Sequence, residues 1–154
     1  MIDIVTNKHV VAFPSKVAAA SGSPHQWDII LGANTDNGAL CTLGNYVSHF
    51  NYTQGAAPQN FAGKILEQET SNGHWYIQVT NAAGAIFLYN SPISEYGEKL
   101  LQGEDLYFNE KDRVCRGYQL IDTDIIEISA LGFNGVPVAG KAVSYANGKY
   151  VVAS

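Results

Sequence analysis

The sequence predicts an all-β fold: a single compact barrel or sandwich of hairpins, with an extended amino-terminal arm and at most one short helix. The dipeptide Asn-Gly suits the positive φ angles of tight hairpin turns, and it occurs four times, at residues 37–38, 72–73, 134–135 and 147–148. Apolar and polar residues alternate beside these turns with the period of two typical of half-buried strands. The stretch at about 92–102 reads as the one helix, because Ser91 suits the N-cap and Pro92 the first turn.

The last Asn-Gly pair predicts the sharpest hairpin. The segment GKAVSYANGKYVVAS reads as a strand, a two-residue turn and a second strand. This register places Tyr145 opposite Tyr150 and Val143 opposite Val152.

The second pair predicts another hairpin, within FAGKILEQETSNGHWYIQVT. Trp75, Ile77 and Val79 alternate with polar neighbours, so we expect Trp75 to face the core. The alternative is that Trp75, Tyr76 and Tyr89 form an exposed aromatic platform for a sugar.

Further strands are expected on both sides of this hairpin. The apolar run AIFLYN at 85–90 suits a central strand, and ALCTLG at 39–44 behaves alike. The stretch GEDLYFNEKDRVCRGYQL at 103–120 and the following TDIIEIS at 123–129 are predicted to form a meander of three consecutive strands.

Residues 1–154 are expected to form one domain, with residues 1–24 as the arm and residues 25–154 as the barrel or sandwich. The small-residue stretch VAAASGSP offers little apolar area to bury, and a strand-forming strip precedes it. Such a strip can add to the sheet edge of another chain. The predicted partner-binding residues of this strip are Ile2, Ile4, Val10 and Phe13.

The composition narrows the function classes. The net charge is −5, from nine basic and fourteen acidic residues, and without a basic stripe no nucleic-acid partner is expected. Neither a signal peptide nor a membrane span is expected, because no long apolar run occurs. Charged residues make up 15% of the chain, below the typical ~25%. Much of the surface is therefore expected to be amide, hydroxyl and aromatic, as in proteins that contact other proteins.

Motifs for chemistry are incomplete. The stretch GVPVAGKA at 135–142 begins like a phosphate loop, but Ala142 stands where Ser or Thr would hold magnesium. The histidines lack zinc spacing. Asp122 and Asp124 could pair as acid and base, although Asp-Thr-Asp at a strand entry suits a solvated turn. We therefore expect no catalytic residue, no cofactor and no metal.

The stretch at 103–120 contains both arginines and one of the two cysteines. Arg113 and Arg116 lie on opposite faces of a strand, so they cannot clamp one anion together. Both are predicted to bind a partner, with Arg116 in an ion pair inside an interface or at the barrel mouth. Cys41 and Cys115 are either separate buried thiols or a single bridge. A thiolate at Cys115, activated by the nearby cations, is the enzymatic alternative.

Together, DNGALCTLGNY, FAGKILEQE…GHWYIQV, LYFNEKDRVCRGYQL…TDIIEIS and AGKAVSY…GKYVV resemble the small all-β head-auxiliary proteins of tailed bacteriophages, also called capsid decoration or cement proteins. The resemblance covers residues 36–152 in order and texture, and it transfers no residue role. It implies a non-enzymatic virion structural protein, made in the host cytoplasm, that binds the outside of an assembled capsid and stabilises contacts between major capsid proteins. It also implies a homo-oligomer, with a trimer possible. The alternative is a carbohydrate- or receptor-binding β-module.

Overall fold

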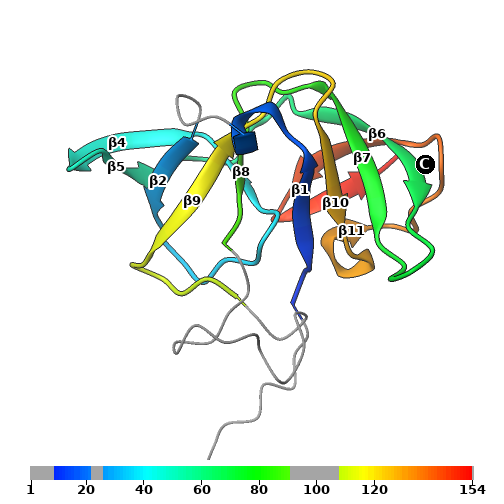
Figure 1. Ribbon diagram of the computed structural model, residues 1–154, viewed down its shortest axis with the longest axis horizontal. Coiled ribbons are helices and arrows are strands. Elements are labelled where there is room, and N and C mark those ends of the chain that lie inside the picture. Colours follow the sequence, from blue (N-terminus) through cyan, green and yellow to red (C-terminus); the bar gives the residue numbers. More distant parts are fainter. Residues whose placement is uncertain (1–8, 22–25, 91–107, 154) are drawn as a thin grey trace, which may run out of the picture.

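The computed structural model describes residues 9–21, 26–90 and 108–153. Two curled β-sheets form a compact sandwich (Figure 1), which confirms the predicted all-β class. The predicted helix at about 92–102 lies outside the described residues. Among the residues that are described, no helix is long and apolar enough to span a membrane.

The first sheet has seven strands in the order β1-β10-β7-β6-β12-β13-β11. Its neighbours pair antiparallel except β11 and β13, which are parallel. Its strands are β1 (Ala12–Lys16), β6 (Ala62–Gln68), β7 (Trp75–Asn81), β10 (Ile125–Ile128), β11 (Phe133–Asn134), β12 (Ala142–Ala146) and β13 (Lys149–Val152).

The second sheet has six strands in the order β3-β8-β9-β2-β5-β4. Its strands are β2 (Gln26–Ile30), β3 (Leu40–Cys41), β4 (Leu43–Ser48), β5 (Asn51–Gln54), β8 (Ile86–Leu88) and β9 (Val114–Gln119). The two ends of this order are consecutive in the chain, because Thr42 alone separates β3 from β4. Thr42 exchanges backbone hydrogen bonds with the segment after β5: its N–H donates to Ala56 and its carbonyl accepts from Gly55. The sheet therefore curls until its ends meet.

Two apolar cores follow from this arrangement. The main core joins the sheets and includes Ile65 and Ile77 from the first sheet and Phe87 from the second. A smaller second core belongs to the curled sheet and consists of Ile29, Leu31, Cys41, Ile86, Leu88 and Cys115. All three residues of β8 are buried and the strand lies between β3 and β9, which confirms the central strand predicted for residues 85–90.

Both of the best-defined hairpins are confirmed. Strands β12 and β13 pair with Tyr145 opposite Tyr150 and Val143 opposite Val152. Strands β6 and β7 pair antiparallel around the second Asn-Gly. Trp75 is partly buried against the main core, as its alternation predicts.

The predicted meander is wrong. Strand β9 pairs with β2 and β8, whereas β10 pairs with β1 and β7 in the other sheet. The chain crosses between the sheets at residues 121–124, where the Asp124 carboxylate accepts the backbone N–H of Ile121 and Asp122 accepts that of Ala82. Alternating residues identify strands but not their neighbours, so consecutive strands were assigned to one sheet.

Part of the predicted arm belongs to the sandwich. Strand β1 pairs with β10, and Ala12, Val17 and Ala19 are buried in the main core. Small residues allow this close approach: a Cβ on Gly38 would lie 2.7 Å from the Cβ of Ala12. Residues 12–19 therefore pack without large side chains, which the estimate of buried area from the sequence did not anticipate.

Candidate functional site

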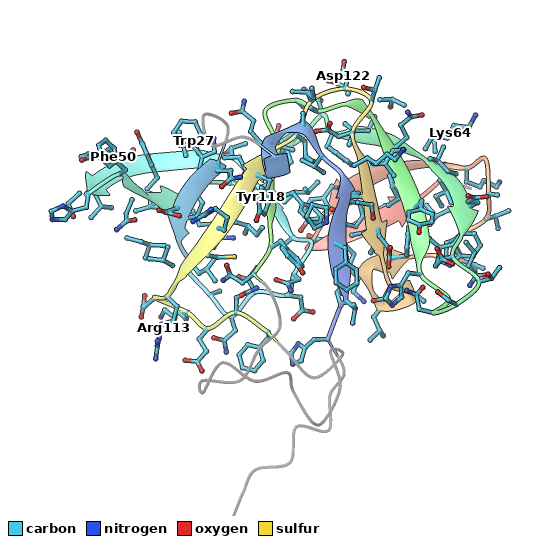
Figure 2. All side chains as sticks on the ribbon, viewed as in Figure 1. Trp27, Phe50, Lys64, Arg113, Tyr118 and Asp122 are labelled. Carbon is cyan, nitrogen blue, oxygen red and sulfur yellow. The ribbon has the colours of Figure 1, made fainter. Side chains whose placement is uncertain are left out.

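The feature that stands out from the sandwich is the β4–β5 hairpin, residues 43–54. It projects at one end of the molecule (Figure 1), and Phe50 lies at this end (Figure 2). Its exposed apolar side chains are Leu43, Tyr46, Val47 and Phe50, of which Phe50 is 80% exposed. An exposed apolar surface of this kind marks a contact site for another molecule.

The tip of the hairpin has an unusual backbone. Ser48 pairs with Asn51, so His49 and Phe50 form a two-residue turn. Their φ angles are 50° and 65°, in the left-handed region that Gly and Asn normally occupy in such turns. A side chain in this region costs roughly 1–2 kcal/mol, and such conformations concentrate at functional sites. The tip therefore places an exposed aromatic ring where local stability alone would favour Asn-Gly.

The hairpin is also free of formal charge. No Asp, Glu, Lys or Arg occurs between Asp36 and Lys64, although the chain as a whole has a net charge of −5. Strand β4 is last in its sheet, and edge strands in natural proteins commonly carry charges that prevent association. Two irregularities in the register with β5 bend β4, which makes the side chains of the tip a better contact than the backbone edge.

An aromatic row fixes the hairpin to the second core. The Tyr52 ring makes edge contacts at 5.3 Å with Trp27 on one side and Tyr46 on the other. Trp27 Nε1 donates a hydrogen bond to Gln119 Oε1. The hairpin strands also approach closely, since a Cβ on Gly44 would lie 2.3 Å from the Thr53 carbonyl oxygen. These contacts hold the tip in a defined position.

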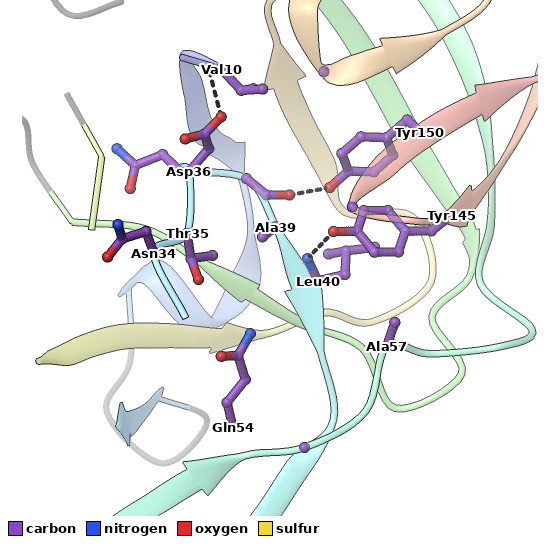
Figure 3. A pocket seen from close by; sticks show the side chains of 15 residues that line it. Val10, Asn34, Thr35, Asp36, Ala39, Leu40, Gln54, Ala57, Tyr145 and Tyr150 are labelled. Atoms are coloured by element: carbon purple, nitrogen blue, oxygen red, sulfur yellow. Dashed lines mark hydrogen bonds between the residues drawn. The ribbon is translucent and has the colours of Figure 1, made fainter. Parts of the chain in front are cut away.

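A pocket lies between the two sheets (Figure 3), with a volume of about 400 Å³. Its walls are residues 34–40, the segment after β5 and the β12–β13 hairpin. The Tyr145 hydroxyl accepts the N–H of Leu40, and the Tyr150 hydroxyl donates to the carbonyl of Gly38. These polar groups bond the walls to each other, which makes the pocket a joint between the sheets.

The pocket has one acidic group, and it is paired. Asp36 accepts the backbone N–H of Val10, and its other oxygen lies 2.6 Å from His9 Nδ1. Across residues 9–21, 26–90 and 108–153, no three His, Cys, Asp or Glu side chains lie where they could hold a metal ion.

The predicted ion pair of Arg116 is present on the surface. Its Nε lies 3.1 Å from Asp28 Oδ1, and the two side chains are 46% and 41% exposed. An exposed pair of this kind contributes about 0.2–1 kcal/mol, well below a buried one. Arg113 lies 3.9 Å from Glu110 and is more exposed still.

The other predicted partner-binding residues lie around β1. Val10 packs against the main core, and the Phe13 ring contacts His74 and Tyr89. Ile2 and Ile4 lie outside the described residues. A role in binding a partner stays a prediction for these four residues and for both arginines.

The sugar platform proposed around Trp75 is not formed. Trp75 and Tyr89 pack against the main core. Tyr76 donates its hydroxyl proton to Glu69 Oε2 at 2.7 Å. Neighbouring residues of a strand face opposite sides of its sheet, so the Trp75 and Tyr76 rings do not share a face.

The remaining sequence motifs have structural roles. Asp122 and Asp124 accept backbone N–H groups in the crossing turn, which supports the turn interpretation over an acid–base pair. Residues 135–142 lead into strand β12 and not into a helix, so they lack the helix terminus that a phosphate loop requires.

The two cysteines are free thiols in the second core. Burial raises the pKa of each thiol to about 12, and only the thiolate is a good nucleophile. The proposed reactive thiolate at Cys115 therefore has no support in the geometry.

We expect both cysteines of the native protein to resist iodoacetamide at pH 7–8 and to react fully in guanidinium chloride. Because both folded-state pKa values lie above the model value of 9.0, the thiols ionise first in the unfolded chain, so stability falls as the pH rises above about 9. Mass spectrometry after timed labelling measures the reaction. Rapid labelling of the native protein at neutral pH would contradict the burial.

The hairpin tip was missed from the sequence because Ser-His-Phe-Asn lacks a turn signature. The signal that could have found it is the long uncharged stretch between Asp36 and Lys64.

Comparisons with protein-family models, with curated proteins and with solved structures find no significant match. The fold and the site define the chain as an all-β sandwich with a projecting, uncharged apolar hairpin.

Proposed function

We propose that this chain is a non-enzymatic structural protein of a virion. It binds the outside of an assembled phage capsid and stabilises contacts between major capsid proteins, and the β4–β5 hairpin is its protein-contact element. The observation that carries the proposal is the hairpin tip, where Phe50 is 80% exposed on a left-handed backbone within an uncharged segment.

The chemistry of the tip suits a protein partner. The centres of protein interfaces are depleted of charged residues and enriched in aromatic ones. A few anchor side chains there contribute most of the binding energy. Phe50 has the geometry of such an anchor, and the surrounding Tyr46 and Val47 would exclude water from it.

The test uses shells assembled from the capsid protein encoded beside this chain's gene. We expect the native protein to cosediment with these shells to a saturable level. We expect Phe50→Ala to weaken binding by tenfold or more, which is the effect of truncating an anchor. Ile121→Ala is the matched control, because Ile121 is an exposed apolar residue in the crossing turn. Absence of saturable binding, or equal losses in both variants, would contradict the proposal.

A carbohydrate-binding module is the second candidate, and the aromatic row of Trp27, Tyr52 and Tyr46 favours it. Tyr46 is 56% exposed and could stack on a sugar ring. This candidate requires Tyr46 and tolerates Phe50→Ala, so glycan-array binding by the two variants separates it from capsid attachment.

A further inference from the structure

A second apolar surface lies on the β11–β12 loop, residues 135–141. Val136 is 79% exposed, and Val138 is also exposed. No charged residue occurs between Glu127 and Lys141. Among the described residues, Phe50 and Val136 are the two most exposed large apolar side chains. Each therefore belongs to a neutral apolar patch on an otherwise acidic protein.

The two patches lie at opposite ends of the molecule. The β11–β12 loop ends beside β6, where Gly140 donates its N–H to the Ile65 carbonyl and Ala142 pairs with Lys64. Figure 2 shows Lys64 at the end of the molecule away from Phe50. A copy that contacts both neighbours could thus use one patch at each end.

Charge favours a second copy over a charged partner at these patches. Every copy has a net charge of −5, so two copies repel each other wherever acidic surfaces meet. The β4–β5 hairpin and the β11–β12 loop are the places where two copies can approach without this repulsion. The loop also has a restricted backbone, because Pro137 has a fixed φ angle.

We infer that the β4–β5 hairpin of one copy packs on the β11–β12 loop of the next, so that the chain associates with itself head to tail. The inference rests on the proposed role of the hairpin as a protein-contact element and names its partner. Because the two contacting patches differ, the interface is heterologous and forms either a closed ring or an open row. On a capsid, such contacts would link neighbouring copies across the surface.

Sedimentation velocity of Phe50→Asp, Val136→Asp and an equimolar mixture of the two tests this arrangement. We expect the native protein to show a weight-average mass that rises with concentration. Each variant alone should stay monomeric, because a buried charge blocks one of its patches. The mixture should form a dimer, since the hairpin of one variant and the loop of the other are intact. Ile121→Asp is the control and should associate like the native protein.

Three results would overturn the inference: a native protein that stays monomeric, a Val136→Asp variant that associates normally, or a mixture that stays monomeric. Should Val136→Asp fail to fold by circular dichroism, Val138→Asp replaces it in the mixture. Capsid binding without self-association would leave the proposed function standing and overturn this inference. Self-association without capsid binding would do the reverse.

Discussion

Tyr150→Ala is expected to lower the free energy of unfolding by about 3–5 kcal/mol, the cost of truncating a fully buried aromatic residue. The Tyr150 side chain is 2% exposed. Its ring lies 5.1 Å from Tyr145, 6.0 Å from Phe61 and 6.3 Å from Phe133. Removing it would leave a cavity next to the segment that joins the two sheets, where rigid neighbours cannot close the gap.

Tyr150→Phe separates the hydroxyl from the ring. The Tyr150 hydroxyl donates to the Gly38 carbonyl at 2.7 Å, and an unsatisfied buried acceptor costs about 1–3 kcal/mol. Urea unfolding measures both variants. Tyr46→Ala is the matched control and should cost no more than about 1.5 kcal/mol, the contribution of one ring pair. If Tyr150→Ala were as mild as this control, the joint between the sheets would not depend on the Tyr150 ring.

The sequence was most informative where structure is local. Asn147 and Gly148 have φ angles of 52° and 78°, as the two-residue hairpin turn requires, and the register of β12 and β13 follows from that turn. Asn37-Gly38 and Asn134-Gly135 do not form such turns. Gly38 precedes β3, and Gly135 follows β11, which runs parallel to β13. An Asn-Gly pair therefore predicts a turn more securely than it predicts a hairpin.

Long-range arrangement was not predictable in the same way. Alternation correctly placed Ile126 and Ile128 in the core, but it carries no information on which strands become neighbours. The parallel pairing of β2 with β5 has no local signal at all. Strand β1 was missed because Ala12, Val17 and Ala19 pack by close contact and not by large area.

The candidate site was predictable only in part. Its uncharged character can be read from the sequence between Asp36 and Lys64. The turn itself cannot, because His49 and Phe50 are poor residues for a left-handed backbone and neither Gly nor Asn occupies the two central positions. Such a conflict between local preference and fold is expected mainly at functional sites.

This conflict leads to the second large effect, for the double substitution His49→Asn with Phe50→Gly. Asn and Gly adopt the φ angles of 50° and 65° with less strain than His and Phe. We therefore expect the free energy of unfolding to rise by about 1–2 kcal/mol, as estimated from the cost of a left-handed conformation. The same change removes the exposed ring, so self-association and capsid binding should fall to background.

Opposite changes in stability and binding would identify the tip as a place where the protein gives up stability for function. His49→Asn alone is the control, because it relieves one position and keeps Phe50. It should stabilise the fold by a smaller amount and leave binding intact. Urea unfolding and sedimentation velocity on the three proteins measure both properties. A double variant that still associates would show that Phe50 is not the contact, and one that unfolds more easily would show that the turn is not strained.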